Sequence, residues 1–421
     1  MHRFFRGDFF NFEVIRLLGT TRYGGADVAE VLEAVGNIRE NDPITWHKAW
    51  SEQAKRTEGL AHEAEEHGHR HAAKMALLRA SNYTRASAYM MTGQSLGLSD
   101  SRVIPILKQS VGLFHRALAF MDNTVHILQI PYQDGVSLPG YLYLPHPSHC
   151  IKGRVPLVVN PIGADSIQEE IYHMFPAAGP DLGYAVFTFE GPGQGLTLHE
   201  KGIPMRPDWE VLSDLVLDYL FKWAEDRNIE LDPDRVAVAG ASLAGYFALR
   251  ASAGTRYKAC VAIDPVQDLW EFATDHVSPG FLGLWNRGWI PDWVVDKMII
   301  LGTRFSFQMR WEIYTTARFL GVTTPTKILR KMKQFTLRTD RGSRLDEVKC
   351  PVLVAGAANS LYFDVDKHSL ATYERLGAGI KELWVATHPG EGSLQAKMGA
   401  LALCNQRVFQ FLDKQFGISR T

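Results

Sequence analysis

The pattern of apolar and polar positions changes near Thr124. Before that point apolar residues recur at helical spacing, as in 46–68, where Trp46, Trp50 and Ala54 share one face. Residues 1–123 therefore predict an all-helical domain. Its expected helices lie within 46–68, 71–91 and 100–120, and Asp27 is expected to cap a further helix through Val31 and Leu32.

Short apolar strands alternating with helices follow this helical region. The first two expected strands, 125–131 and 138–144, flank Gln133-Asp134-Gly135, which is a hairpin signal. Further strands are expected at 155–160, 184–190, 235–239, 259–263, 351–355 and 382–386. Buried apolar strands separated by helices are typical of a largely parallel sheet. Residues 124–265 and 346–421 therefore predict the two parts of an α/β core, which ends in a helix over about 394–416.

A tryptophan-rich helical stretch at 266–345 separates the two parts of the core. Because α/β sheets bind ligands at the carboxyl edge of their strands, we expect this insertion to form a cap over that edge. Its tryptophans are expected to fill the core of the cap. An alternative is that Trp285, Trp289 or Trp293 also lines an apolar substrate pocket.

Composition and charge narrow the class of protein. The chain has 421 residues, 46% of them apolar, and a formal net charge of −1, which argues against nucleic-acid and membrane-surface partners. Its four widely spaced cysteines are typical of free thiols in a reducing, cytoplasmic setting. We expect no metal, because His67, His69 and His71 are two residues apart and point to different helix faces.

The strongest motif is Gly240-Ala241-Ser242-Leu243-Ala244-Gly245, between an apolar strand and an apolar helix. This arrangement is typical of a nucleophile elbow, in which a serine is held on a strained turn and small neighbours clear the space around it. Ala244 stands where the second glycine of the usual G-x-S-x-G pattern would be. The expected catalytic serine is Ser242.

The chain resembles the α/β-hydrolase superfamily, and most closely the branch of dihydroxypseudooxynicotine hydrolase and the fungal polyketide-shortening and polyketide-cyclising hydrolases. The resemblance rests on 23–27, 78–83, 191–195 and the elbow, and it spans nearly the whole chain. It implies a helical domain packed over a hydrolase core with the substrate between them. It also implies chemistry without a cofactor on C–C or C–O bonds of aromatic or polyketide ketones. We therefore expect a small apolar ketone or polyketide-like substrate, and a homodimer.

Two positions depart from the pattern of a serine hydrolase. The acid that normally follows the strand 351–355 is replaced by Asn359, and the histidine that normally precedes the last helix is replaced by Ser393. An amide cannot stabilise an imidazolium as a carboxylate does. His388 as base and Asp364 as acid are the alternatives if the loops are remodelled, with Asp366 close behind.

The remaining candidates surround the expected oxyanion. Its donors are expected to be the backbone N–H of Leu243 and one from the loop that contains Ile162 and Gly163. The resemblance implies a functional glutamate in the segment after this loop, which makes Glu169 a candidate acid or base and Asp165 a weaker one. Alternatively, both are first-turn acidic residues favoured by a helix dipole.

Three functions remain open from the sequence. The first is a biosynthetic enzyme that uses the hydrolase pocket for non-hydrolytic ring closure or C–C bond chemistry, because an oxyanion hole and a shaped pocket survive the loss of acid and base. The second is a true hydrolase with His388 and Asp364 in a relocated triad. The third is a pseudohydrolase that only binds a small apolar ligand or a partner.

Overall fold

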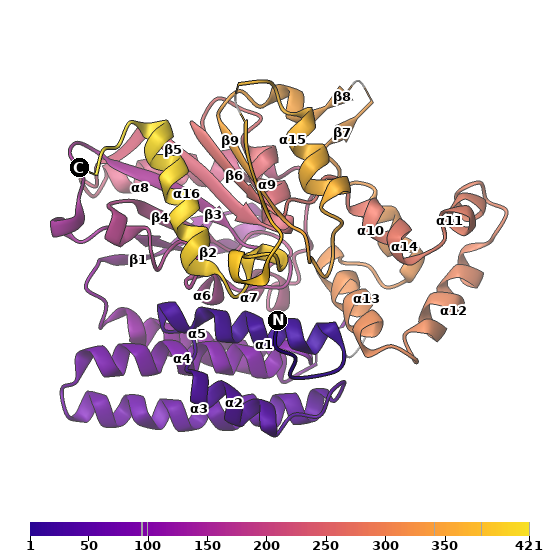
Figure 1. Cartoon of the computed structure of the whole chain (residues 1–421), viewed down its shortest axis with the longest axis horizontal. Coiled ribbons are helices and arrows are strands. Elements are labelled where there is room, and N and C mark those ends of the chain that lie inside the picture. The colour runs from indigo at the N-terminus through magenta and orange to yellow at the C-terminus, as the bar shows by residue number, and fades with distance from the viewer. Residues whose placement is uncertain (94–95, 99, 341, 380, 421) are drawn as a thin grey trace.

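The computed structural model describes residues 1–93, 96–98, 100–340, 342–379 and 381–420. Its N-terminal region is helical, as the sequence predicts, and Figure 1 shows these helices stacked along one side of the molecule. They are α1 (Asp8–Leu18), α2 (Val28–Gly36), α3 (Pro43–Glu66), α4 (Arg70–Tyr89) and α5 (Val103–Leu118). The predicted cap of α2 is confirmed, since the Asp27 carboxylate accepts the N–H of Ala29 at 3.0 Å.

Helix α1 has no counterpart among the predicted helices. Its residues from Phe9 to Leu17 are all buried, including the charged Glu13 and Arg16. A helix that is buried on every side has no polar face, so the apolar periodicity that reveals a surface helix is missing.

The core is an eight-stranded sheet in the order β1-β2-β4-β3-β5-β6-β9-β10. The strands are β1 (Val125–Pro131), β2 (Ser137–Tyr143), β3 (Val155–Pro161), β4 (Ala185–Phe189), β5 (Leu231–Ala241), β6 (Ala259–Ile263), β9 (Val352–Ala357) and β10 (Lys381–Ala386). Strand β2 pairs antiparallel with β1 and β4, and the other neighbouring pairs are parallel. The predicted hairpin and the largely parallel sheet are therefore confirmed.

Alternate residues of each strand enter two separate cores, as the two-residue period of a strand requires. On one face Leu157 and Val159 pack with helices α8 (Trp209–Glu225) and α9 (Leu243–Ala251). On the other face Val158 packs with α4, α5 and the last helix, α16 (Leu401–Phe416). The N-terminal helices thus cover part of one face of the sheet.

The insertion after β6 is helical, as predicted, and it projects from the sheet in Figure 1. Its helices are α10 (Leu269–His276), α11 (Pro279–Asn286), α12 (Asp292–Gly302), α13 (Phe307–Leu320) and α14 (Pro325–Met332), and together they form the cap. A two-stranded hairpin comes after the cap, formed by β7 (Arg338–Thr339) and β8 (Gly342–Ser343).

The last helix begins later than predicted. It starts at Leu401, whereas the sequence pattern predicts a start near 394. The intervening loop contains Ala396 and Lys397 in left-handed conformations, with φ of 57° and 59°. This backbone turns the Lys397 side chain into the interior, where its ammonium donates to the carbonyl of Gly356 at 2.6 Å. A helix through this segment would lose that contact.

Candidate active site at Ser242

Ser242 lies on a strained turn between β5 and α9. Its backbone has φ 59° and ψ −125°, a conformation that costs a non-glycine residue about 1–3 kcal/mol. The turn is held by the Ser242 N–H, which donates to the carbonyl of Ile263 at 2.8 Å. A Cβ at Gly240 would lie 2.2 Å from the carbonyl oxygen of Ala244, so only glycine fits there. These observations give the turn the geometry of a nucleophile elbow.

Ser242 opens onto two cavities. The larger, of about 120 Å³, lies between the core and the cap. The smaller, of about 70 Å³, lies between the core, α1 and the loop before α16. Asp165 and Tyr362 line both cavities, Trp311 lines the larger, and Gln395 lines the smaller. In the part of the chain that the structure describes, no histidine lines either of them.

The predicted oxyanion donors lie beside Ser242. Leu243 lines the larger cavity and Gly163 the smaller. As the first residue of α9, Leu243 has an N–H with no acceptor within the helix. Ile162 is fully buried, and the side-chain amide of Gln194 donates to its carbonyl. The turn that contains Gln194 therefore holds the loop after β3, which contains Ile162 and Gly163, in place.

The two substituted triad positions meet, but neither lines the cavities at Ser242. The N–H of Asn359 donates to the carbonyl of Ser393 at 2.8 Å, so the loops after β9 and β10 do lie side by side. Ser393 is completely buried, and its hydroxyl has no hydrogen-bond partner among the described residues. Neither side chain lines the cavities at Ser242, where Gln395 and Ala396 lie instead.

The alternative base and acid lie on the outside of the molecule. His388 is exposed and precedes the turn Pro389–Glu391. Asp364 is also exposed, and its carboxylate accepts the N–H groups of Asp366 and Lys367 at 2.8 and 3.1 Å. Neither His388 nor Asp364 lines a cavity at Ser242, so the structure does not bring them together with the serine.

The tryptophans named from the sequence also lie away from Ser242. Trp285 is buried within the cap and donates its indole N–H to Asp292 at 2.9 Å. Trp289 is 75% exposed and Trp293 is 61% exposed. The tryptophan that lines the Ser242 cavity is Trp311 of α13.

A buried ion pair fixes the loop that replaces the histidine loop of a hydrolase. Lys397 is completely buried, and its ammonium lies 3.5 Å from the carboxylate of Asp264. That carboxylate also accepts the N–H of Ala396 at 2.7 Å. Burial raises the pKa of Asp264 to about 6, although Lys397 acts in the opposite direction. The pair locks the loop 394–400 against β6 and β9.

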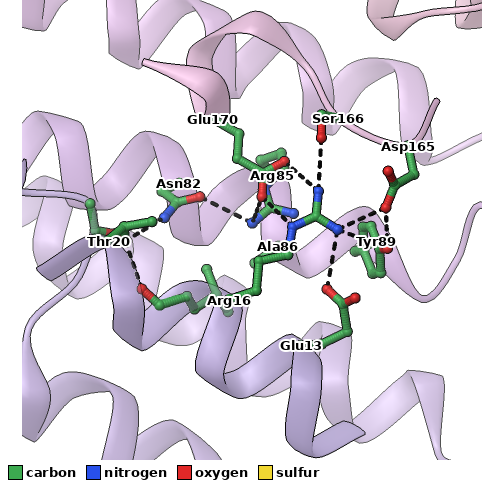
Figure 2. A network of polar contacts seen from close by, with 12 residues as sticks. Glu13, Arg16, Thr20, Asn82, Arg85, Ala86, Tyr89, Asp165, Ser166 and Glu170 are labelled. Carbon is green, nitrogen blue, oxygen red and sulfur yellow. Dashed lines mark hydrogen bonds and ion pairs between the residues drawn. The ribbon is translucent and has the colours of Figure 1, made fainter. Parts of the chain in front are cut away.

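A polar network centred on Arg16 organises the opposite side of the site (Figure 2). The guanidinium binds both oxygens of Glu170, at 2.6 and 2.8 Å, and one oxygen of Asp165 at 2.7 Å. The Tyr89 hydroxyl donates to the same Asp165 oxygen at 2.5 Å. Residues of α1 and α4 thus hold the loop after β3 in place.

Asp165 presents a fixed negative charge to the cavities. Asp165 is accessible to solvent, with 34% of its side-chain surface exposed, and it lines both cavities at Ser242. Burial acts to raise its pKa, but Arg16 and the hydrogen bond from Tyr89 outweigh burial and leave that pKa below its ordinary value. Asp165 is therefore ionised at neutral pH.

Glu169 is buried and bonded to a tyrosine of β2. It accepts the Tyr141 hydroxyl at 2.6 Å, and its other oxygen has no partner among the described residues. Burial raises the pKa of Glu169 to about 7. It does not line the cavities at Ser242, whereas Asp165 lines both of them and Glu312 lines the larger.

Several residues of the site carry no signal in the sequence. Arg16, Tyr362, Trp311 and Thr315 reach the cavities from α1, the loop after β9 and α13. Only contacts between distant segments bring them together, and no local motif marks them. A third cavity of about 40 Å³, which includes Asp165 but not Ser242, is lined by His199. Burial lowers the pKa of His199 to about 4, so this histidine is neutral.

Comparison with known proteins decides the family. A family model described as Esterase FrsA-like matches residues 29–276, which is more than half of the chain. The chain belongs to the FrsA-like esterase family. It is therefore an enzyme of the α/β-hydrolase fold, and the resemblance drawn from the sequence is confirmed.

Three similar proteins come from fungi. The hydrolyase ccsE of Aspergillus clavatus is 52% identical, over 100% of this chain and 99% of its own length. The hydrolase ORFZ of Pyricularia oryzae is 50% identical, over 100% of this chain and 99% of its own length. The hydrolase pyiE of Pyricularia grisea is 49% identical, over 100% of this chain and 98% of its own length.

Two solved structures share the fold at low sequence identity. The 2,6-dihydroxy-pseudo-oxynicotine hydrolase superposes with a TM-score of 0.61 at 19% identity, and 95% of each chain is covered. AbyA5 superposes with a TM-score of 0.62 at 16% identity, over 95% of this chain and 94% of its own. Both likenesses extend to the N-terminal helices as well as the core.

Proposed function

We propose that this enzyme catalyses non-hydrolytic ring closure or C–C bond formation on an apolar, polyketide-like ketone or aldehyde. The observation that carries the proposal is the surroundings of Ser242. An elbow serine with oxyanion donors opens onto cavities that no histidine of the described chain lines, and an ionised carboxylate, Asp165, faces the same space.

The geometry suits the stabilisation of an oxyanion without activation of the serine. The Ser242 hydroxyl and the Leu243 N–H would hold a substrate carbonyl, and such preorganised donors stabilise charge that develops on its oxygen. Asp165 would accept a proton from the carbon next to an activating carbonyl. The carbanion then attacks the held carbonyl, one C–C bond forms, and the alkoxide regains the proton from Asp165.

Loss of water would complete such a condensation. Two fungal relatives, ccsE and the poxO protein of Penicillium oxalicum, are named hydrolyases, a term that fits enzymes that remove or add water.

An apolar cavity of about 220 Å³ inside the cap supports an apolar substrate. It shares Phe272, Glu312, Thr316 and Met332 with the larger cavity at Ser242, so a chain bound at the serine has room to extend.

Ester or C–C hydrolysis is the second candidate, and the family description and the names of other relatives favour it. It requires a base for Ser242, and His388 with Asp364 is the pair that the sequence offers. The homodimer, the cytoplasmic location and the absence of a cofactor, which the sequence also predicts, stay predictions.

Labelling with a fluorophosphonate serine probe separates these functions. We expect folded wild-type protein to resist labelling while it converts polyketide ketones or aldehydes to ring-closed products. Strong labelling that is lost in both Ser242→Ala and His388→Ala would establish the hydrolase with a relocated base. Absence of any turnover, with a ligand that still raises the thermal midpoint, would establish the pseudohydrolase.

A further inference from the structure

The outer end of the cap carries a concentration of exposed apolar side chains. Fifteen large apolar residues are exposed in the described chain, and six of them lie within 284–305. Three are aromatic: Trp289 is 75% exposed, Trp293 61% and Phe305 84%. Leu284, Met298 and Leu301 complete the group. Clustering of this kind marks an interaction surface, whereas single exposed apolar residues need no explanation.

Helix α12 shows why this surface needs a partner. Val295 and Ile299 are buried and face the interior of the cap. On the outside, Trp293, Met298 and Leu301 are each more than half exposed. A surface helix normally carries polar residues on its outer face. In the described chain, α12 exposes these three apolar side chains there.

The charge of the part of the cap from α11 to α14 indicates the chemistry of that partner. From Pro279, where α11 begins, to Lys333, the residue after α14, the chain has nine Lys and Arg against three Asp and Glu, a net charge of +6. Because the whole chain has a net charge of −1, the remainder carries −7. The sequence-based expectation of no membrane partner rests on the total charge, which conceals this asymmetry.

The acidic residues of α12 are engaged within the cap, whereas the cations beside the apolar group are not. Asp292 accepts two hydrogen bonds from Arg330, both at 2.7 Å, and Asp296 accepts the N–H of Thr326 at 2.8 Å. Arg287, Lys297 and Arg304 are exposed and belong to no ion pair in the described part of the chain. Lys297 lies 5.0 Å from the ring centre of Trp293, within the apolar group.

We propose that the outer face of α11 and α12 is a docking surface for an anionic lipid bilayer. Tryptophan and phenylalanine side chains insert at the boundary between headgroups and acyl chains, and Lys and Arg add attraction to anionic headgroups. Figure 1 shows α11 and α12 at the outermost end of the cap, where a flat surface has unhindered access. No helix of the described chain is long and apolar enough to cross a bilayer, so the contact is superficial.

The apolar cavity of the cap lies next to this surface. Ile299, on the inner side of α12, lines that cavity, which shares residues with the cavity at Ser242. Docking would place an enzyme for apolar substrates where such molecules concentrate. The proposal does not rest on the reaction type, because docking is measured as binding.

Co-sedimentation with vesicles tests the proposal. Wild-type protein is mixed with phosphatidylcholine vesicles with and without phosphatidylserine. We expect binding to the anionic vesicles only, weakened by added salt. Trp289→Ser with Phe305→Ser, and separately Lys297→Glu with Arg304→Glu, are each expected to weaken it about ten-fold or more. All four positions are exposed, so the thermal midpoint should not change.

A matched pair of substitutions controls for general hydrophobicity. Ile44→Ser with Leu60→Ser removes apolar side chains that are 58% and 50% exposed on α3, and this variant should bind like the wild type. Failure of the wild type to bind anionic vesicles, or equal loss in the control, overturns the proposal. A wild-type dimer that Trp289→Ser with Phe305→Ser turns into monomers, without vesicle binding, would assign the face to a second copy of the chain instead.

Discussion

The two sides of the Ser242 site differ in where their charged side chains lie. On the side of α1 and the β3 loop, charged residues reach the cavity: Asp165 faces it and is held by Arg16 and Tyr89. On the side of the β9 and β10 loops, where a serine hydrolase has its acid and base, the charged pair Lys397 and Asp264 is buried beneath the loop. One side presents charge to a substrate, and the other uses charge to hold the backbone. An ionised carboxylate therefore reaches the cavities at Ser242, although no histidine of the described chain lines them.

Replacing Lys397 with Met should have the largest effect on stability. It leaves the Asp264 carboxylate buried without its partner, a change that typically costs about 3–5 kcal/mol. The loss should shrink in acid, below the Asp264 pKa of about 6, because the carboxyl is then neutral. Urea unfolding at neutral and acid pH measures both quantities.

Lys414→Met is the matched control for this pair. Lys414 is 70% exposed and contacts Glu382 on the surface, where an ion pair contributes about 0–1 kcal/mol. Equal destabilisation by the two substitutions would mean that the Lys397 pair does not lock the loop.

Replacing Glu169 with Gln should stabilise the protein at high pH. The pKa of Glu169 is raised from 4.5 to about 7 in the folded state, so folding favours its neutral form. The wild type therefore loses stability as the pH rises from about 4.5 through about 7. The substituted amide is neutral throughout and can still accept the Tyr141 hydroxyl. We expect the variant to be more stable than the wild type at pH 8, and this advantage to disappear at pH 4.

Chemical unfolding across this pH range checks the expectation. Glu66→Gln, at an exposed position in the last turn of α3, should leave the pH dependence unchanged. Parallel stability curves for the wild type and Glu169→Gln would contradict the raised pKa.

Asp165→Asn should lower the rate of ring closure about 100-fold, since general acid–base groups typically contribute about 10²–10⁴. The thermal midpoint should change little, because Arg16 keeps both of its bonds to Glu170. Ser166→Ala is the matched control: it removes a 2.9 Å contact to Arg16 but leaves the carboxylate at the cavity. Similar rate losses in both variants would mean that Asp165 only helps to hold the loop after β3 and does not act as the base.

Local sequence is sufficient to predict the sheet, the cap and the elbow. A strand or a helix is determined largely by the period of its own side chains, and the Ser242 turn by the small residues beside it. The two positions that depart from the hydrolase pattern, Asn359 and Ser393, can also be found, because motif spacing alone locates them.

The side chains that surround Ser242 cannot be predicted in the same way. Arg16 and Asp165 are 149 residues apart in the sequence and meet only through tertiary packing. The sequence around Lys397 favours a surface helix. In the structure, however, the Lys397 side chain is buried and donates to the carbonyl of Gly356 in β9. Long-range acceptors for buried charges leave no periodic signal.

His388→Ala should have the smallest effect, with activity within about two-fold of the wild type and stability within about 0.5 kcal/mol. The side chain is exposed and lines neither cavity at Ser242. To act as the base it would have to enter a space now lined by Gln395 and Ala396, whose loop the buried Lys397 holds. Ser242→Ala is assayed in parallel, and it gives the loss of activity expected when a residue of the site is removed. If His388→Ala lowered activity as much as Ser242→Ala does, the loop after β10 would have to rearrange during turnover. The side of the β9 and β10 loops would then take part in the chemistry as well as holding the backbone.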